Sequence, residues 1–279
     1  MAADQNMLVS AGAGIAEDQA GGIGSDVIPG HASIWRQPLP WLDGQPLTRF
    51  FVRGVLSGFR RKLISVQGLE RISPSQGPFI LVLNHSQALE VLLLPALLFF
   101  ARGGKRVHFM ADWNFRLIPL VDIFYRCGQV ITLTRKPAKP RWLDFMRPWF
   151  AEPEGAYEKA ARLLREGASV GIFPEGTINR SPRRLLKGYS GAAQLSLETG
   201  YPLVPAGIRF PESAMASGRI AELSPMEVRF GTPMVPPAAQ AAPDLGEVRE
   251  WHASLMSAIA SLCGKTWDKQ SVRRGREDQ

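Results

Sequence analysis

The chain has 279 residues, enough for one large α/β domain or two small ones. Hydrophobic types make up 45% and charged types 21%, a composition that allows a sizeable buried core and excludes wholesale disorder. The formal net charge of +8 suits an anionic partner: a nucleic acid, a membrane surface or a phosphorylated substrate. Cys127 and Cys263 lie far apart, and no two of the four histidines have ligand spacing, so we expect neither a disulfide nor a metal site.

Residues 1–44 are predicted to be a disordered leader. The segment is rich in Gly and Ala near its start, has an acidic residue at Asp4, and contains no apolar core of signal-peptide length. The longest apolar stretch of the chain, 79–101, is interrupted by polar residues and by Pro95. A membrane-spanning helix needs about 20 largely apolar residues, so we predict none.

Residues 45–63 are predicted to form an amphipathic helix. Apolar residues recur there at helical spacing: Phe50, Phe51, Val55, Leu56, Phe59 and Leu63. Five cations and no acids accompany them: Arg49, Arg53, Arg60, Arg61 and Lys62. Two compatible interpretations follow, a surface helix packed on the domain and a helix lying in the headgroup layer of an anionic membrane. We therefore expect a peripheral protein on the cytoplasmic face of a membrane.

From Gly77 onward, short apolar runs alternate with segments of helical period. The predicted strands are 79–83, 106–110, 129–133, 169–173, 203–210 and 226–230. The predicted helices include 154–167, 188–200 and 245–263, with a proline-rich loop over 232–244. This alternation predicts an α/β fold with a mixed or mostly parallel sheet flanked by helices. We expect one domain over 45–265, followed by a basic flexible tail over 266–279.

Polar residues interrupt the apolar run at Asn84 and His85, directly after the first predicted strand. Open α/β sheets place ligand crevices at this carboxyl edge. A carboxylate bonded to one imidazole nitrogen would fix the tautomer and leave the other nitrogen free to accept a proton. Residues five apart on a regular helix differ by about 140° in direction. His85 and Glu90 can therefore meet only if His85 lies in the turn before the helix. The alternative is a histidine that is merely satisfied in the core.

A second polar turn, "FPEGT" at 173–177, follows the predicted strand 169–173. Glu175 would be a second acid at the same edge, Gly176 would allow close approach of a ligand, and Thr177 could donate a hydrogen bond. Four cations follow: Arg180, Arg183, Arg184 and Lys187. The alternative for this turn is an exposed glutamate beside a solvated basic loop.

Four segments occur in order and at suitable distances: "NHSQALE" (84–90), "GQVITLTR" (128–135), "FPEGT" (173–177) and "YPLVPAGI" (201–208). They resemble the four sequence blocks of the glycerol-phosphate and lysophospholipid acyltransferases, and the resemblance covers roughly 66–231. It implies direct transfer of a fatty acyl chain from acyl-CoA or acyl-carrier protein to the hydroxyl of lysophosphatidic acid or a related lysophospholipid. No cofactor and no acyl-enzyme would be needed.

The resemblance also implies roles for individual residues. His85 takes the place of the general base and Glu90 that of the acid that orients it. Arg135 matches a residue linked to the acceptor phosphate. The other candidates for substrate binding are Asn84, Glu175, Gly176, Thr177, Arg180 and Lys187.

Two departures from the family pattern leave alternatives open. Ile178 stands where phosphatidic-acid-forming members commonly have arginine, so the acceptor can be a different lipid hydroxyl or an amine. Glu90 stands where the family usually has aspartate, which also allows a catalytically weak lipid-binding protein on the same scaffold. A serine hydrolase is disfavoured because "GYSGA" lacks the Gly-x-Ser-x-Gly spacing. We find no nucleic-acid-binding motif, and membrane binding accounts for the basic charge.

Overall fold

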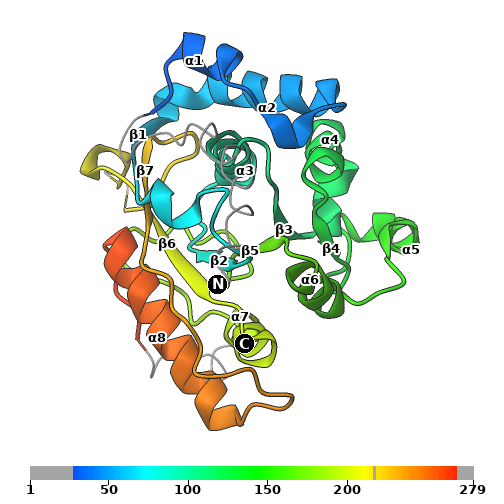
Figure 1. The fold of residues 1–279 in the computed structure, drawn as a ribbon, viewed down its shortest axis with the longest axis vertical. Helices are drawn as coiled ribbons and strands as arrows, with labels where there is room; N and C mark the ends of the chain where they lie inside the picture. The colour runs from blue at the N-terminus through cyan, green and yellow to red at the C-terminus, as the bar shows by residue number, and fades with distance from the viewer. Residues whose placement is uncertain (1–27, 216–217, 269–279) are drawn as a thin grey trace, which may run out of the picture.

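The computed structural model describes residues 28–215 and 218–268, and a seven-stranded sheet runs through its centre (Figure 1). The strands are β1 (Leu63–Gln67), β2 (Ile80–Leu83), β3 (Val107–Asp112), β4 (Ile131–Leu133), β5 (Ser169–Ile172), β6 (Leu203–Arg209) and β7 (Met226–Phe230). Their order is β1-β7-β6-β2-β5-β3-β4. From β6 to β4 the neighbours are parallel, whereas β6 and β7 are antiparallel and β1 is parallel to β7. The predicted fold class is confirmed.

Helices cover both faces of the sheet (Figure 1). They are α1 (His31–Arg36), α2 (Pro46–Phe59), α3 (Glu90–Ala101), α4 (Pro119–Gly128), α5 (Arg147–Phe150), α6 (Ala156–Arg165), α7 (Gly191–Thr199) and α8 (Leu245–Cys263). Short 3-10 turns are η1 (Pro40–Leu42), η2 (Arg60–Lys62), η3 (Leu69–Ile72), η4 (Trp113–Leu117), η5 (Arg141–Met146) and η6 (Glu212–Met215). Among the described residues, no helix is both long and apolar enough to cross a bilayer.

Strand β2 shows how the sheet divides two cores. Leu81 and Leu83 pack with α1, α2 and α3, whereas Ile80 and Val82 pack with α6, α7 and α8. Side chains alternate between the faces of a strand, so an apolar run with both faces covered is a central strand. The carboxyl end of β2 therefore lies in the middle of the fold, between two helical layers.

The six predicted strands correspond to β2 to β7, and the predicted helix 245–263 is α8. Strand β1 is not among the predictions, because its first residue, Leu63, also continues the helical spacing of α2. The structure shows α2 ending at Phe59, followed by the 3-10 turn η2. In β1 the buried residues are Leu63 and Val66, three positions apart, because the register with β7 shifts between Leu63 and Ser65, an irregularity common at sheet edges.

The predicted disordered leader is too long. Residues 28–44 contain α1 and η1, because Ile34, Leu39 and Leu42 are buried in the core with α2 and α3. The backbone N–H of Trp41 also donates to the carbonyl of Gly103 at 3.1 Å. Residues 1–27 lie outside the described part of the chain. So does most of the predicted tail, of which only 266–268 are described.

Candidate active site

His85 and Glu90 meet at the carboxyl end of β2. His85 lies in the turn after the strand and Glu90 is the first residue of α3, so the pair spans the strand-to-helix junction. The imidazole Nδ1 and the carboxylate Oε2 are 2.8 Å apart. An ionised carboxylate only accepts hydrogen bonds, so this contact places the ring proton on Nδ1. Among the described residues the ring's Nε2 has no hydrogen-bond partner, so this nitrogen is free to accept a proton.

The carboxylate of Glu90 is held by the turn it belongs to. Its Oε2 also accepts from the backbone N–H of Ser86 at 2.8 Å, and its Oε1 accepts from that of Gln87 at 3.2 Å. The side chain is fully buried. Burial raises the pKa of Glu90 above its ordinary value, while the bond to His85 and the backbone N–H of Ser86 oppose that rise. The turn thus fixes a buried acid against the imidazole.

The ring of His85 has few ways to turn. Its centroid lies 4.6 Å from that of Phe173, which directly follows β5. The residue is buried, with 7% of its surface exposed. Packing on one side and the carboxylate on the other restrict the imidazole to one orientation, as proton transfer requires.

Two buried amides fasten the turn to the rest of the fold. Asn84 donates to the carbonyl of Ile208 at 3.1 Å and accepts from its N–H at 2.7 Å. Gln87 makes the same pair of contacts with Ser224, at 2.9 and 3.0 Å. Asn84 is a predicted substrate-binding residue, but its amide faces β6. This geometry favours a positioning role.

Glu175 lies beside the first turn and is also buried. Its Oε1 accepts from the backbone N–H of His85 at 3.2 Å. Its Oε2 accepts from the N–H of Leu186 at 2.8 Å and from the side-chain amide of Asn179 at 2.6 Å. Both oxygens are occupied by the protein. The exposed-glutamate alternative is therefore wrong, and Glu175 ties the basic loop to the backbone of His85.

The end of the second turn faces outward. Gly176 has φ = +65°, and a Cβ at this position would lie 2.6 Å from the ring of Tyr189. Only glycine fits this conformation and this approach without strain. The carbonyl of Gly176 accepts from Nζ of Lys136 at 2.7 Å. Thr177 is exposed beyond it.

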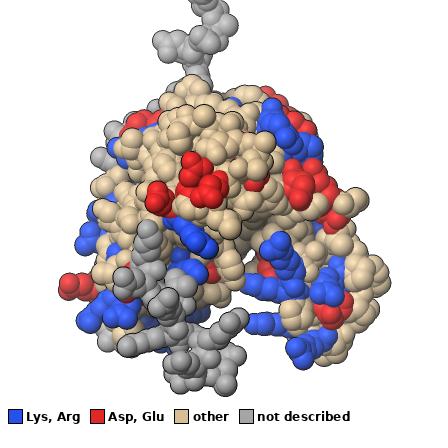
Figure 2. Space-filling model, turned by 90° about the horizontal axis from the view of Figure 1, so that it is seen from below, with Lys and Arg blue, Asp and Glu red and all other residues tan. Residues whose placement is uncertain are grey.

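The predicted phosphate-binding cations are spread along this edge. Arg135 and Lys187 are exposed, whereas Arg180 forms an ion pair with Glu222. Arg135 follows β4, three strands from β2, so it lies roughly 14 Å across the sheet edge at the usual strand spacing. Figure 2 shows one face of the molecule, with Lys and Arg side chains gathered on both sides of a hollow in its lower part.

One residue that the sequence did not indicate reaches this site from the other end of the chain. Lys265, just after α8, is buried and donates to the hydroxyl of Ser86 at 2.9 Å. The backbone N–H of Ser86 in turn donates to Glu90. A lysine after a helix is ordinary in sequence, and only the fold brings these positions together.

Comparisons with known proteins place these residues in context. A family model described as Acyltransferase matches residues 63–209. A chloroplastic 1-acyl-sn-glycerol-3-phosphate acyltransferase of Brassica napus is 27% identical over 164 residues, 59% of this chain and 42% of that protein. A 1-acyl-sn-glycerol-3-phosphate acyltransferase of Borreliella burgdorferi is 30% identical over 143 residues, 51% of this chain and 49% of that protein. The matched parts span about half of these relatives or less.

A solved structure has a similar fold. It is the 1-acyl-sn-glycerophosphate acyltransferase PlsC from Thermotoga maritima, with a TM-score of 0.51 and 20% sequence identity over 80% of each chain. The His85 and Glu175 turns both lie inside the segment that the family model matches.

Proposed function

Since this chain belongs to the acyltransferase family, we propose that it transfers a fatty acyl chain from a thioester to the hydroxyl of lysophosphatidic acid. The donor would be acyl-CoA or acyl-carrier protein. The observation that carries the proposal is the 2.8 Å contact between Nδ1 of His85 and Glu90, with Nε2 left free at the carboxyl edge of the sheet. The names of the curated relatives support the acceptor.

The proposed chemistry is one direct displacement. Nε2 of His85 accepts the proton of the acceptor hydroxyl as its oxygen attacks the thioester carbonyl. The tetrahedral intermediate then expels the thiolate, which takes the proton back from the imidazolium. Glu90 stabilises that imidazolium through Nδ1. A general base in such a position raises the reaction rate by roughly 10²–10⁴-fold. The products are the acylated lipid and the free thiol.

The cations of the same edge suit the phosphates of both substrates. Arg135 and Lys187 are exposed and can meet a phosphate directly. Arg180 would first have to leave Glu222, so it is the weaker candidate for a bare phosphate. Together with Ile178, this pairing favours testing acceptors with larger head groups, or with an amine, alongside lysophosphatidic acid.

The test is acyl transfer by purified His85→Ala. We expect loss of thiol release and of acylated product by roughly 10²-fold or more, with the thermal unfolding midpoint little changed. The matched control is His108→Ala. His108 is also buried, but its ring is bonded to the backbone carbonyl of Gln129 and not to a carboxylate. Full activity of folded His85→Ala would refute the mechanism. Vesicle binding without turnover by the wild-type protein would favour the lipid-binding alternative.

We also propose that the protein binds peripherally to a membrane surface through α1 and α2. Val52 and Leu56 of α2 are buried in the core, so most of its apolar side packs on the domain. Leu47 and Phe50 remain exposed, and the ring of Phe50 lies 6.0 Å from that of Trp35. We expect weaker binding to anionic vesicles, and a smaller effect of salt, when the cations of α2 and η2 are replaced by glutamine: Arg49, Arg53, Arg60, Arg61 and Lys62. Equal co-sedimentation of both proteins at low salt would contradict this attachment.

A further inference from the structure

The connection between β4 and α6, residues 134–155, carries a group of exposed aromatic side chains. Trp142 and Trp149 are each 71% exposed and Phe145 is 61% exposed. All three come from η5 and α5, which lie at the margin of the molecule in Figure 1, across the sheet from α8. Large aromatic rings in water are unfavourable, and an exposed cluster of them marks an interaction surface.

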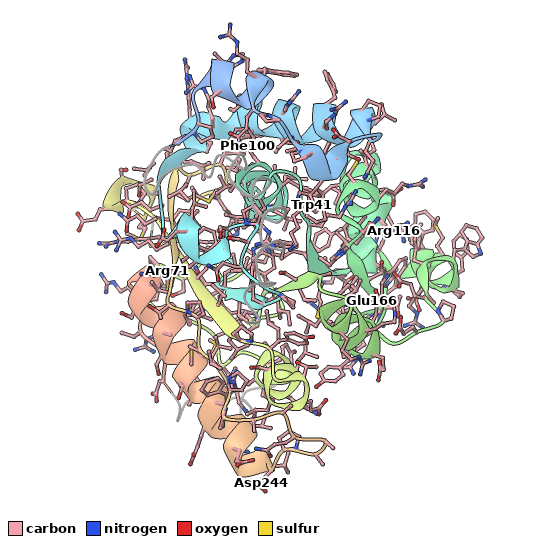
Figure 3. All side chains as sticks on the ribbon, in the orientation of Figure 1. Trp41, Arg71, Phe100, Arg116, Glu166 and Asp244 are labelled. Atoms are coloured by element: carbon pink, nitrogen blue, oxygen red, sulfur yellow. The ribbon has the colours of Figure 1, made fainter. Side chains whose placement is uncertain are left out.

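These rings are outside although the segment itself is well anchored. Phe150 packs inward, with its ring centroid 5.6 Å from that of Trp113 and 5.0 Å from the guanidinium of Arg116. Arg116, labelled in Figure 3, also lies over Tyr125 of α4 and so joins α4 to α5. The indole of Trp113 donates to the carbonyl of Lys136 at 2.9 Å. One aromatic residue thus fixes the segment while three others face outward.

The charge around the aromatic rings is strongly positive. Residues 134–150 contain one acid, Asp144, and five cations: Arg135, Lys136, Lys139, Arg141 and Arg147. Asp144 is occupied within the segment, where it accepts from the N–H of Ala138 at 3.0 Å and lies 3.5 Å from Arg147. Aromatic rings among cations match the interface of an anionic bilayer, where rings enter the headgroup layer and cations meet lipid phosphates.

We propose that residues 134–150 form a second membrane contact, the η5–α5 contact, which binds anionic lipid separately from α1 and α2. Its position links it to the candidate site, since Lys136 of the segment donates to the carbonyl of Gly176. Ile118, just before α4, and Ile123 within it are exposed apolar residues on the helix that lies between α5 and α2 in Figure 1. Bilayer contact at α5 would therefore hold the turn of Glu175 and Gly176 near the lipid surface, where a lysolipid acceptor resides. This link rests on the proposed function, whereas binding to lipid does not.

The experiment compares vesicles of phosphatidylcholine with and without phosphatidylglycerol. We expect Trp142→Ser, Phe145→Ser and Trp149→Ser together to lower the partition coefficient for anionic vesicles by at least about tenfold, because burying one such ring is worth about that much. The matched control is Val235→Ser with Leu245→Ser, two exposed apolar residues outside the segment, which should bind like the wild type. Unchanged partitioning of the triple variant would overturn the proposal.

A second measurement decides the case if the triple variant does not fold. Brominated lipids quench tryptophans that enter the bilayer, and Trp142→Phe with Trp149→Phe keeps the apolar rings while removing two of the seven tryptophans. We expect this variant to bind like the wild type but with clearly less quenching. Equal quenching would overturn the proposal, as would sedimentation showing that the three rings support a dimer and no vesicle binding. His85→Ala should bind vesicles normally, which separates this contact from the proposed chemistry.

Discussion

The turns after β2 and β5 lie side by side, and each holds a buried carboxylate, but the two acids have different partners. Glu90 is bonded to an imidazole as well as to backbone N–H groups. Glu175 is bonded only to amides, one of them the backbone N–H of His85. An acid that shares a hydrogen bond with a ring can influence a proton transfer at that ring, whereas an acid enclosed by amides can only hold a shape.

This difference assigns separate tasks to neighbouring residues of the same type. Glu90 should determine how well His85 works as a base, and Glu175 should determine whether the site is assembled. Replacing either acid by a neutral side chain tests the distinction. The Glu90 variant should lose mainly activity, whereas the Glu175 variant should lose mainly stability.

The largest effect is expected on stability from Glu175→Ala. This change takes the acceptor from three donors, of which those of His85 and Asn179 are buried, and each buried loss costs about 1–3 kcal/mol. We expect the free energy of unfolding, measured in urea, to fall by about 3 kcal/mol or more. The control Glu166→Ala removes an exposed partner of Arg162 and should cost less than about 1 kcal/mol. Equal losses in both variants would remove the structural role of Glu175.

Glu90→Gln should act mainly on turnover. The glutamine NH₂ would face an N–H donor of the turn or of His85, so the tautomer with a proton on Nδ1 loses support. We expect kcat to fall by roughly 10–100-fold, less than in His85→Ala, with a smaller change in the acceptor KM. Glu90→Asp restores the usual family residue and should retain more activity than Glu90→Gln. Steady-state kinetics on all three proteins gives the order, and an unimpaired kcat in Glu90→Gln would contradict the assignment.

The contact between His85 and Glu90 could be predicted from the sequence because it depends only on where one strand ends and the next helix begins. A strand end and a helix start lie within seven residues, and only one arrangement lets the two side chains touch. The strands of the central sheet were predictable for a similar reason, since runs such as 79–83 are apolar on both faces. Strand β1 was not, because an edge strand that follows a helix shares its first apolar residue with the helical pattern.

Contacts between distant segments could not be predicted in this way. Glu175 was predicted to bind a ligand, since the sequence around it does not show that the N–H of Leu186 and the side-chain amide of Asn179 donate to its carboxylate. Asn84 likewise read as a substrate contact, although its partner is Ile208 on a strand 124 positions away. Residues 28–44 looked disordered because three buried side chains among glycines and prolines do not form a periodic pattern.

Lys265→Met tests how the positive charge near Glu90 affects catalysis. The positive charge of Lys265 lowers the pKa of Glu90, against the larger rise caused by burial. Without that charge the pKa of Glu90 rises further, so Glu90 becomes protonated at a higher pH as the solution is acidified. We expect the acid limb of the plot of kcat against pH to move to higher pH, and kcat at neutral pH to fall several-fold. Lys265→Arg keeps the charge and should restore the limb. A lower kcat with an unmoved limb would mean that Lys265 only supports packing at Ser86.

The smallest effect is expected at Arg135, which belongs to neither buried network. Its side chain is exposed, so water and salt weaken its attraction for a phosphate, and it lies roughly 14 Å along the sheet edge from β2. It should therefore contribute to substrate binding equally before and during reaction. We expect Arg135→Ala to raise the KM for lysophosphatidic acid by no more than about tenfold, with kcat unchanged. Arg135→Lys should recover only part of the loss, because a single ammonium cannot reproduce two parallel guanidinium contacts. Arg126→Ala, which removes an exposed arginine paired with Asp122 on α4, is the matched control and should leave KM unchanged. If kcat fell with Arg135 and KM did not, this arginine would act during the reaction, and the chemistry would extend beyond the turn of His85.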